Sequence, residues 1–125
     1  MSNIVCRVLP FAAAELMCPA ASEAQDTSAG QQVFQAQCGI CHSAEPSRNL
    51  AGPSLHGVAV RPSGQMAGFA YSAANRNSWI VWTPETLDLY LTSPKGGVPH
   101  NFMTCGVLKD ARKRADLIAY LMSLR

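Results

Sequence analysis

Apolar residues recur along this chain at the spacing of α-helices rather than that of β-strands. Gly30, Val33 and Phe34 fall at i, i+3 and i+4 within a Gln-rich stretch, which predicts a helix over residues 28–38 with its N-cap among residues 26–28. No segment of the sequence alternates apolar and polar residues over the length of a strand. The pattern therefore predicts an all-α fold.

The second half of the chain contains the clearer helical signals. Thr83 and Pro84 provide a capping hydroxyl and a proline at the first helical position, and Pro94 is expected to end the helix that they start. Ser72 is expected to cap a short helical turn over residues 71–75. A last helix is predicted from about Asp110 to about Leu124. Its predicted apolar face consists of Leu117, Tyr120, Leu121 and Leu124. The basic side chains expected to be exposed to water are Arg112, Lys113 and Arg114.

Two Pro- and Gly-containing stretches are predicted to be loops. Residues 43–65 contain Pro46, Pro53 and Pro62 and several glycines, and residues 94–106 lack helical spacing. Three main helices, a short one and long loops are therefore expected.

The candidate chemistry begins at Cys38-x-x-Cys41-His42. This spacing is typical of covalent c-type haem attachment, in which each thiol adds to one haem vinyl group and the adjacent histidine binds the iron. Cys-x-x-Cys also occurs in zinc sites and redox pairs. Neither Cys105 nor His56 and His100 supplies a second zinc-binding pair, and the helical pattern lacks the βαβ context of a redox pair.

A haem bound in this way also needs a hydrogen-bond acceptor that orients the His42 ring and a sixth ligand for the iron. The Pro53 carbonyl, on a rigid Gly-Pro turn, could accept a hydrogen bond from the second ring nitrogen, although Pro53 could also be an ordinary turn residue. Of five methionines, Met103 lies on a proline-braced loop opposite the attachment motif in the chain. The others are Met1 and Met17 in the first 24 residues, Met66 in a Gly-rich loop and Met122 in a helix. A lone methionine is usually core filler, so loop position alone leaves both roles open.

The first 24 residues differ from the rest in composition. Arg7 precedes an apolar run that ends in small residues, which predicts a secretory signal over 1–24, with cleavage after Ser22 or Ala24. Glu15 interrupts the apolar run, which is too short to span a bilayer. Residues 25–125 then form one domain with nine basic and six acidic residues, a net charge of +3. Nucleic acid is not an expected partner, because no basic tract extends beyond residues 112–114.

Taken together, these residues resemble a class I cytochrome c of the mitochondrial and bacterial periplasmic kind, over residues 30–124. The likeness rests on the opening helix with its haem motif, on Gly52-Pro53-x-Leu55-x-Gly57, on residues 61–75, on Pro99-x-x-x-Met103 and on residues 115–121. It implies loops wrapped around one covalent haem c, axial ligation by His42 and Met103, and Tyr71 and Trp82 as donors to the haem propionates. The cofactor-binding residues that it implies are Cys38, Cys41, His42, Pro53, Arg61, Tyr71, Asn75, Trp82, Tyr90, Asn101 and Met103.

Several positions depart from the family pattern. Val60 and Trp79 stand where relatives usually have glycine, which adds bulk to two turns. Cys105 replaces an aromatic residue at the haem edge. Gln37, Phe102 and Asp110 occupy positions often held by lysine, while Lys95 and Lys109 remain, so steering of acidic partners should be weak. Phe102 either offers an apolar docking contact or folds over the haem.

The resemblance implies a soluble one-electron carrier and no enzyme activity. Expected partners are respiratory or photosynthetic membrane complexes or periplasmic redox proteins, without stable membrane insertion, in the periplasm or alternatively the mitochondrial intermembrane space. A monomer is expected, with a Cys105-linked dimer as the alternative. A rival hypothesis is a labile Met103, loosened by the replacements at Val60 and Cys105, which would make a pseudo-peroxidase or gas binder. Ligation by His100 is disfavoured because it would shift the loop by three residues.

Overall fold

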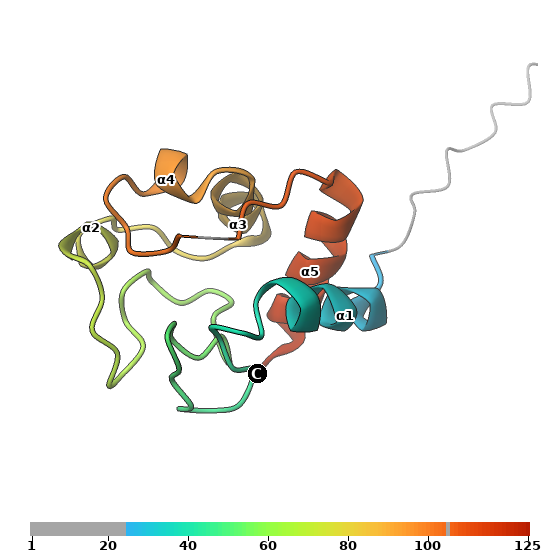
Figure 1. Cartoon of the computed structure of the whole chain (residues 1–125), viewed down its shortest axis with the longest axis horizontal. Helices are drawn as coiled ribbons and strands as arrows, with labels where there is room; N and C mark the ends of the chain where they lie inside the picture. Colours follow the sequence, from blue (N-terminus) through green and yellow to red (C-terminus); the bar gives the residue numbers. More distant parts are fainter. Residues whose placement is uncertain (1–24, 105) are drawn as a thin grey trace, which may run out of the picture.

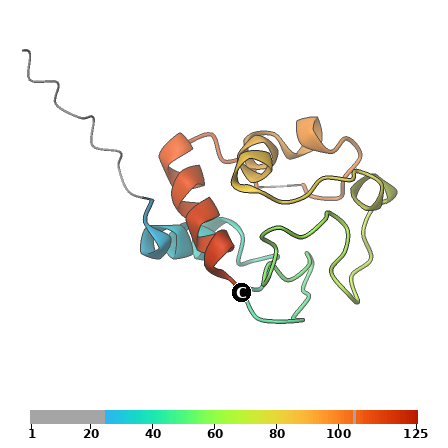
Figure 2. The same cartoon turned by 180° about the vertical axis from the view of Figure 1, so that it is seen from behind.

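The computed structural model describes residues 25–104 and 106–125. Within them five helices occur, α1 (Thr27–Gln37), α2 (Ala73–Arg76), α3 (Pro84–Thr92), α4 (Pro94–Gly97) and α5 (Ala111–Ser123). The predicted signal segment 1–24 and Cys105 lie outside the described residues. Figures 1 and 2 show α1 and α5 crossing at one end of the molecule, α3 and α4 above, and the long loop between α1 and α2 below. The all-α prediction is confirmed.

The crossing of α1 and α5 requires glycine at position 30. A Cβ on Gly30 would lie 1.9 Å from the Asp116 carbonyl oxygen and 2.8 Å from the Tyr120 Cβ, so no other residue fits without separating the helices. One turn further on, the rings of Phe34 and Tyr120 pack with centroids 5.5 Å apart. Glycine destabilises a helix by about 1 kcal/mol relative to alanine. The close approach of the two backbones explains why glycine is nevertheless present at position 30.

Helix starts follow the predicted capping chemistry. The Asp26 carboxylate accepts hydrogen bonds from the amides of Ser28 and Ala29 at the start of α1, and the Ser72 hydroxyl accepts one from the Asn75 amide in α2. Thr83 and Thr86 form a reciprocal capping box at the start of α3. Each cap satisfies amides that would otherwise have no partner in the helix.

The loop predicted over residues 94–106 begins differently. Pro94 does end α3, but it also occupies the first turn of the short helix α4, where the Ser93 hydroxyl accepts a hydrogen bond from the Gly96 amide. Proline is compatible with this position because its missing N–H would have no helical partner. The purely irregular loop was therefore a wrong prediction for residues 94–97.

One basic side chain of α5 was also predicted wrongly. Arg112 and Lys113 are exposed, but the side chain of Arg114 is only 12% exposed and forms an ion pair with Asp88 of α3, with Nε 2.7 Å from the carboxylate. The periodicity of α5 alone could not reveal this contact, because its partner lies 26 residues earlier in the chain.

The loop between α1 and α2 is held by pairing to the segment before α3. Pro62 and Val81 form an isolated antiparallel bridge, flanked by hydrogen bonds from the Val60 amide to the Trp82 carbonyl and from the Ser63 amide to the Ile80 carbonyl. The Gly57 amide binds the Leu124 carbonyl at 2.6 Å, which ties the same loop to the end of α5. The loop is therefore held in its middle, over residues 57–63, although it contains no regular element.

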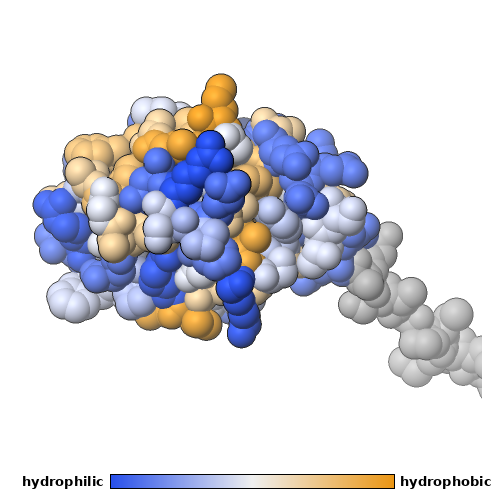
Figure 3. Space-filling view, turned by 90° about the horizontal axis from the view of Figure 1, so that it is seen from below, coloured by the Kyte–Doolittle hydropathy of each residue, from blue (hydrophilic) through white to orange (hydrophobic). Residues whose placement is uncertain are grey.

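The surface mixes hydrophilic side chains with small hydrophobic patches, as Figure 3 shows for one face. Among the described residues, the large hydrophobic side chains that are at least two-fifths exposed are Ile40, Leu50, Val60, Trp79, Val81, Leu89, Phe102 and Val107. No helix of the described chain is long and apolar enough to cross a membrane.

Candidate functional site

A cavity of ≈ 240 Å³ lies between the end of α1, the long loop, α3, α5 and the segment around Met103. All but one of the predicted cofactor-binding residues line it; the exception is Asn101. Those that line it are Cys38, Cys41, His42, Pro53, Arg61, Tyr71, Asn75, Trp82, Tyr90 and Met103. Residues from positions 38 to 103 thus meet around a single space.

The attachment motif forms a tight turn at the end of α1. The amides of Cys41 and His42 both donate to the Cys38 carbonyl, at 3.0 and 2.9 Å. The amide of Gly52 donates to the Cys41 carbonyl at 2.7 Å and brings the 52–53 turn against the motif. Both cysteines and the histidine consequently line the same cavity.

The imidazole of His42 is oriented by the Pro53 carbonyl oxygen, 2.7 Å from Nδ1. Because a carbonyl can only accept, Nδ1 carries the proton and Nε2 retains the lone pair that a metal would use. Burial lowers the pKa of His42, opposed in part by the hydrogen bond to Pro53. The ring is thus kept in the neutral form that binds metals.

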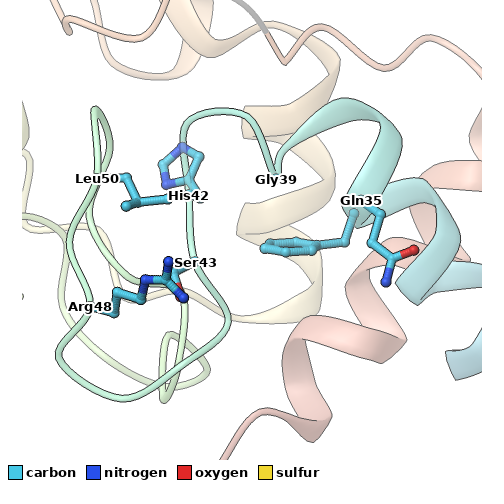
Figure 4. A pocket seen from close by; sticks show the side chains of 7 residues that line it. Gln35, Gly39, His42, Ser43, Arg48 and Leu50 are labelled. Atoms are coloured by element: carbon cyan, nitrogen blue, oxygen red, sulfur yellow. The ribbon is translucent and has the colours of Figure 1, made fainter.

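The turn also confines the ring sterically. A Cβ on Gly52 would lie 2.3, 2.6 and 2.8 Å from the Cε1, Nδ1 and Nε2 atoms of His42. On its outer side the motif borders a second, open hollow of ≈ 310 Å³ lined by Phe34, Gln35, Gly39, His42, Ser43, Arg48 and Leu50. Figure 4 shows this hollow between α1 and the loop that carries Arg48 and Leu50. Arg48 is paired with Glu45 there and stays exposed.

Met103 lies on a loop that is held by hydrogen bonds of the Asn101 side chain. The Met103 amide donates to the Asn101 side-chain oxygen at 2.7 Å, and the Asn101 amide group donates to the carbonyls of Pro94 and Val98 at 2.9 and 2.6 Å. Gly106 has a φ of +91°, and a Cβ there would be 2.1 Å from the Met103 Cε. Asn101, predicted to contact the cofactor, is thus a buried brace that connects Met103 to α4.

Arg61 and Tyr71 lie at another wall of the cavity. The Arg61 guanidinium donates to the carbonyls of His56 and Ser54 at 3.0 and 3.3 Å. The Tyr71 hydroxyl oxygen accepts from the Met66 amide at 3.1 Å, so its own proton is available for another acceptor. Burial raises the pKa of Tyr71 and lowers that of Arg61, and the two side chains partly offset these changes through their mutual attraction.

The aromatic wall is formed by Trp82 and Tyr90, whose rings meet edge to face at 4.9 Å. Burial raises the pKa of Tyr90 to about 12. Asn75 completes this side through its side-chain oxygen, which accepts from the Ser63 hydroxyl at 3.3 Å. The apolar side chains of Leu55, Leu91 and Leu117 line the cavity together with Tyr90, whereas Phe34 packs in the core beside it.

Sequence reasoning singled out fewer wall residues than the cavity has. Val58, Ser63, Leu87 and Leu121 also line it. Leu121 belongs to the predicted apolar face of α5 and Leu87 to the buried face of α3. Helical periodicity identifies such residues as core but cannot show that part of the core faces a cavity. Val58 and Ser63 lie in the long loop and carry no periodic signal.

The donors of the cavity fit haem c and not the alternative metal centres. Two thiols and an imidazole stand in one stretch, a thioether on another segment, and the wall between them is apolar and aromatic. Within residues 25–104 and 106–125, no group of three or more His, Cys, Asp or Glu side chains could hold a metal ion. A structural zinc centre needs four such ligands, so the described part of the chain does not provide one.

Comparison with known proteins decides the family. The family model for cytochrome c matches residues 27–125. The chain belongs to the cytochrome c family. The family binds one covalent haem c through cysteines, so this chain is a haem protein, and members of the family are electron carriers and not enzymes.

Relatives come from bacteria and eukaryotes. The chain is 46% identical over 112 residues to cytochrome c2 of Blastochloris viridis, covering 89% of this chain and 86% of that protein. It is 46% identical over 98 residues to cytochrome c 2.1 of Caenorhabditis elegans, covering 78% and 88%. It is 41% identical over 100 residues to cytochrome c of Euglena viridis, covering 80% and 98%.

Proposed function

We propose that this cytochrome is a soluble one-electron carrier, with haem c attached through Cys38 and Cys41 and with His42 and Met103 as axial ligands. The observation that carries the proposal is the meeting of these four side chains around one cavity, with a hydrogen bond from His42 to Pro53 that leaves Nε2 as the ligand atom. Haem c supplies an iron that gains and loses one electron.

The residues around the cavity have two tasks in this proposal. His42 and Met103 would hold the iron from two segments of the chain, so that little rearrangement would accompany a one-electron change. The side chains of Leu55, Leu91 and Leu117 exclude water from the cavity wall, and an apolar surrounding disfavours the more highly charged ferric form. A thioether ligand acts in the same direction on the reduction potential.

The propionate side of the cofactor would be met by Arg61, Tyr71 and Trp82. The Tyr71 hydroxyl accepts from a backbone amide and therefore keeps its proton for a carboxylate. Arg61 supplies a positive charge, and its remaining donors are oriented by two backbone carbonyls. Asn75 and Tyr90 would complete the polar contacts, and Asn101 would hold Met103 in position through its amide.

The donor and acceptor of electrons would be membrane complexes or redox proteins in the periplasm or the mitochondrial intermembrane space. Relatives from both bacteria and eukaryotes support either location. Residues 1–24 would then be a signal removed on export, and the mature domain would comprise residues 25–125. Mass spectrometry of the exported haem protein tests this, and retention of residues 1–24 would contradict it.

The variant Met103→Ala tests the ligand set, with Met122→Ala as a matched control because Met122 packs against the core on α5 and does not line the cavity. We expect the wild type to show a low-spin reduced spectrum, a sulfur-to-iron charge-transfer band when oxidised, and no response to carbon monoxide. Met103→Ala should keep its haem but become high-spin and bind carbon monoxide, whereas Met122→Ala should keep the wild-type spectrum. A carbon monoxide response of the wild type would favour the pseudo-peroxidase or gas-binding function instead.

A further inference from the structure

The strongest unexplained feature outside the cavity is the burial of Arg114. A long cationic side chain is rarely this buried unless it is paired, and its side chain is only 12% exposed. It lies on α5 and does not line the cavity, so neither haem binding nor the α1–α5 contact accounts for it.

Arg114 connects three parts of the fold. Its Nε donates to the Asp88 carboxylate of α3 at 2.7 Å, and its Nη1 donates to the carbonyls of Leu108 and Lys109, both at 2.9 Å. The two carbonyls belong to the segment that follows the Met103 loop. The same segment is also tied to α3 by a hydrogen bond of 2.8 Å from the Leu108 amide to the Leu91 carbonyl.

The segment that contains Leu108 and Lys109 directly follows the part of the chain that contacts Met103, the proposed ligand. Gly106, two residues before Leu108, has only a hydrogen atom facing the Met103 side chain, and a Cβ there would lie 2.1 Å from the Met103 Cε. On the other side of Met103, Asn101 fixes the backbone through α4. The ligand loop is therefore anchored before Met103 by Asn101 and after it by Arg114.

We infer that Arg114, oriented by Asp88, is a positioning residue that sets how readily Met103 leaves the iron. The inference rests on the proposed ligation by Met103. A guanidinium is suited to this role because its donors form a rigid planar fork that reaches a carboxylate and two carbonyls together, whereas an ammonium has all its donors on one atom at the end of a flexible stem. Loosening the Leu108–Lys109 end should increase the fraction of molecules in which Met103 is displaced, without altering the haem attachment.

Imidazole binding to the oxidised holoprotein measures that fraction, because imidazole takes the iron position only after Met103 has left it, and the apparent Kd scales inversely with the competent fraction. Loss of the charged hydrogen bonds in Arg114→Gln should lower the apparent Kd about tenfold, equivalent to about 1.4 kcal/mol. Asp88→Asn, which leaves the contacts to both carbonyls, should lower it about threefold, and Arg114→Lys should lie between Arg114→Gln and the wild type. In the double variant the effects should not add, since both changes act on one network.

Arg112→Gln is the matched control. Arg112 lies on the same helix and pairs with Asp116 of that helix, with Nε 3.2 Å from the carboxylate. Its apparent Kd should stay within about twofold of the wild type, although its thermal stability falls. An unchanged Kd in Arg114→Gln, or an equal decrease in Arg112→Gln, would overturn the inference.

Met103→Ala separates this failure from failure of the proposed ligation. If Met103 is the ligand, Met103→Ala loses the charge-transfer band and binds imidazole most tightly of the series, whatever Arg114→Gln does. If Met103→Ala keeps the wild-type band and Kd, the proposed ligand set is wrong. Should Arg114→Gln fail to fold, Asp88→Asn carries the test alone.

Discussion

Gly52→Ala tests whether the turn beside the haem motif fixes the His42 ring. The added methyl carbon would lie 2.3 Å from Cε1 of the imidazole, whereas carbon atoms pack at about 3.5–4.0 Å. The ring or the turn must therefore move by about 1.2 Å or more. The hydrogen bond from Nδ1 to the Pro53 carbonyl, now 2.7 Å, would lengthen beyond the usual limit of about 3.2 Å.

The energetic cost has two parts. Overpacking costs about 1–3 kcal/mol, and leaving the Pro53 carbonyl without its donor costs about 1–3 kcal/mol when it remains buried. Some relief through movement of the turn makes about 2–4 kcal/mol a reasonable sum. For a domain of this size about 1 kcal/mol shifts the melting temperature by roughly 4–8 °C, so a decrease of roughly 10–30 °C is expected.

The assay is thermal unfolding of the oxidised holoprotein by circular dichroism, together with its visible spectrum. Gly97→Ala is the matched control, because the three nearest atoms to its Cβ would all belong to Tyr90, a ring carbon at 3.3 Å and the Cα and Cβ at 3.6 and 3.9 Å, on an exposed helical turn. That variant should stay within about 1 kcal/mol of the wild type. If Gly52→Ala melts like Gly97→Ala and keeps an unchanged spectrum, the turn does not confine His42.

Three further predictions concern the loops, a buried tyrosine and partner binding. Val60→Gly and Trp79→Gly should each stabilise the protein by about 0.5–1 kcal/mol in urea unfolding, because both residues have φ of +58° and strain of about 1–2 kcal/mol outweighs the gain in unfolded-state entropy; a loss of stability in both would refute this. Burial raises the pKa of Tyr90 to about 12 in the folded protein, against about 10 in the unfolded chain. The unfolding free energy should therefore be independent of Tyr90 ionisation below about pH 10 and decline between about pH 10 and pH 12, where only the unfolded chain loses the proton. Tyr90→Phe should remove that decline. The rate of electron transfer to an acidic partner should fall less than about tenfold when salt rises from about 10 to about 200 mM, since Lys95 and Lys109 alone retain the expected lysine positions; a steeper fall would indicate strong steering.

The helices could be predicted because their signals are local. Thr83 and Pro84 mark the start of α3 by their own chemistry, and the stripe of α5 follows from 3.6-residue periodicity. The same local reasoning treated Pro94 only as a helix stop. It did not consider that Ser93 before it is a capping residue, although Ser-Pro is as good a helix start as Thr-Pro.

The site was predictable in a different way. The spacing of Cys38, Cys41 and His42 contains the chemistry of haem attachment, so one short stretch indicated the cofactor. The choice of Met103 and the outer residues depended on resemblance to a family, because nothing in their own spacing marks them. The ion pair of Arg114 with Asp88 was missed since it depends on the register of α5 against α3, which no local pattern contains.

The structure also changes the argument for a labile Met103. The sequence suggested that Val60 loosens the ligand loop, but the Val60 amide is bonded to the Trp82 carbonyl, and its segment pairs with residues 80–82. Strain at Val60 therefore acts on the wall of the cavity that contains Arg61 and Trp82. Strain close to Met103 comes instead from His100, which has a φ of +64°. Asn101, the next residue, opposes it with three hydrogen bonds to α4 and Met103, so lability of the ligand depends on whether these bonds and those of Arg114 outweigh the local strain.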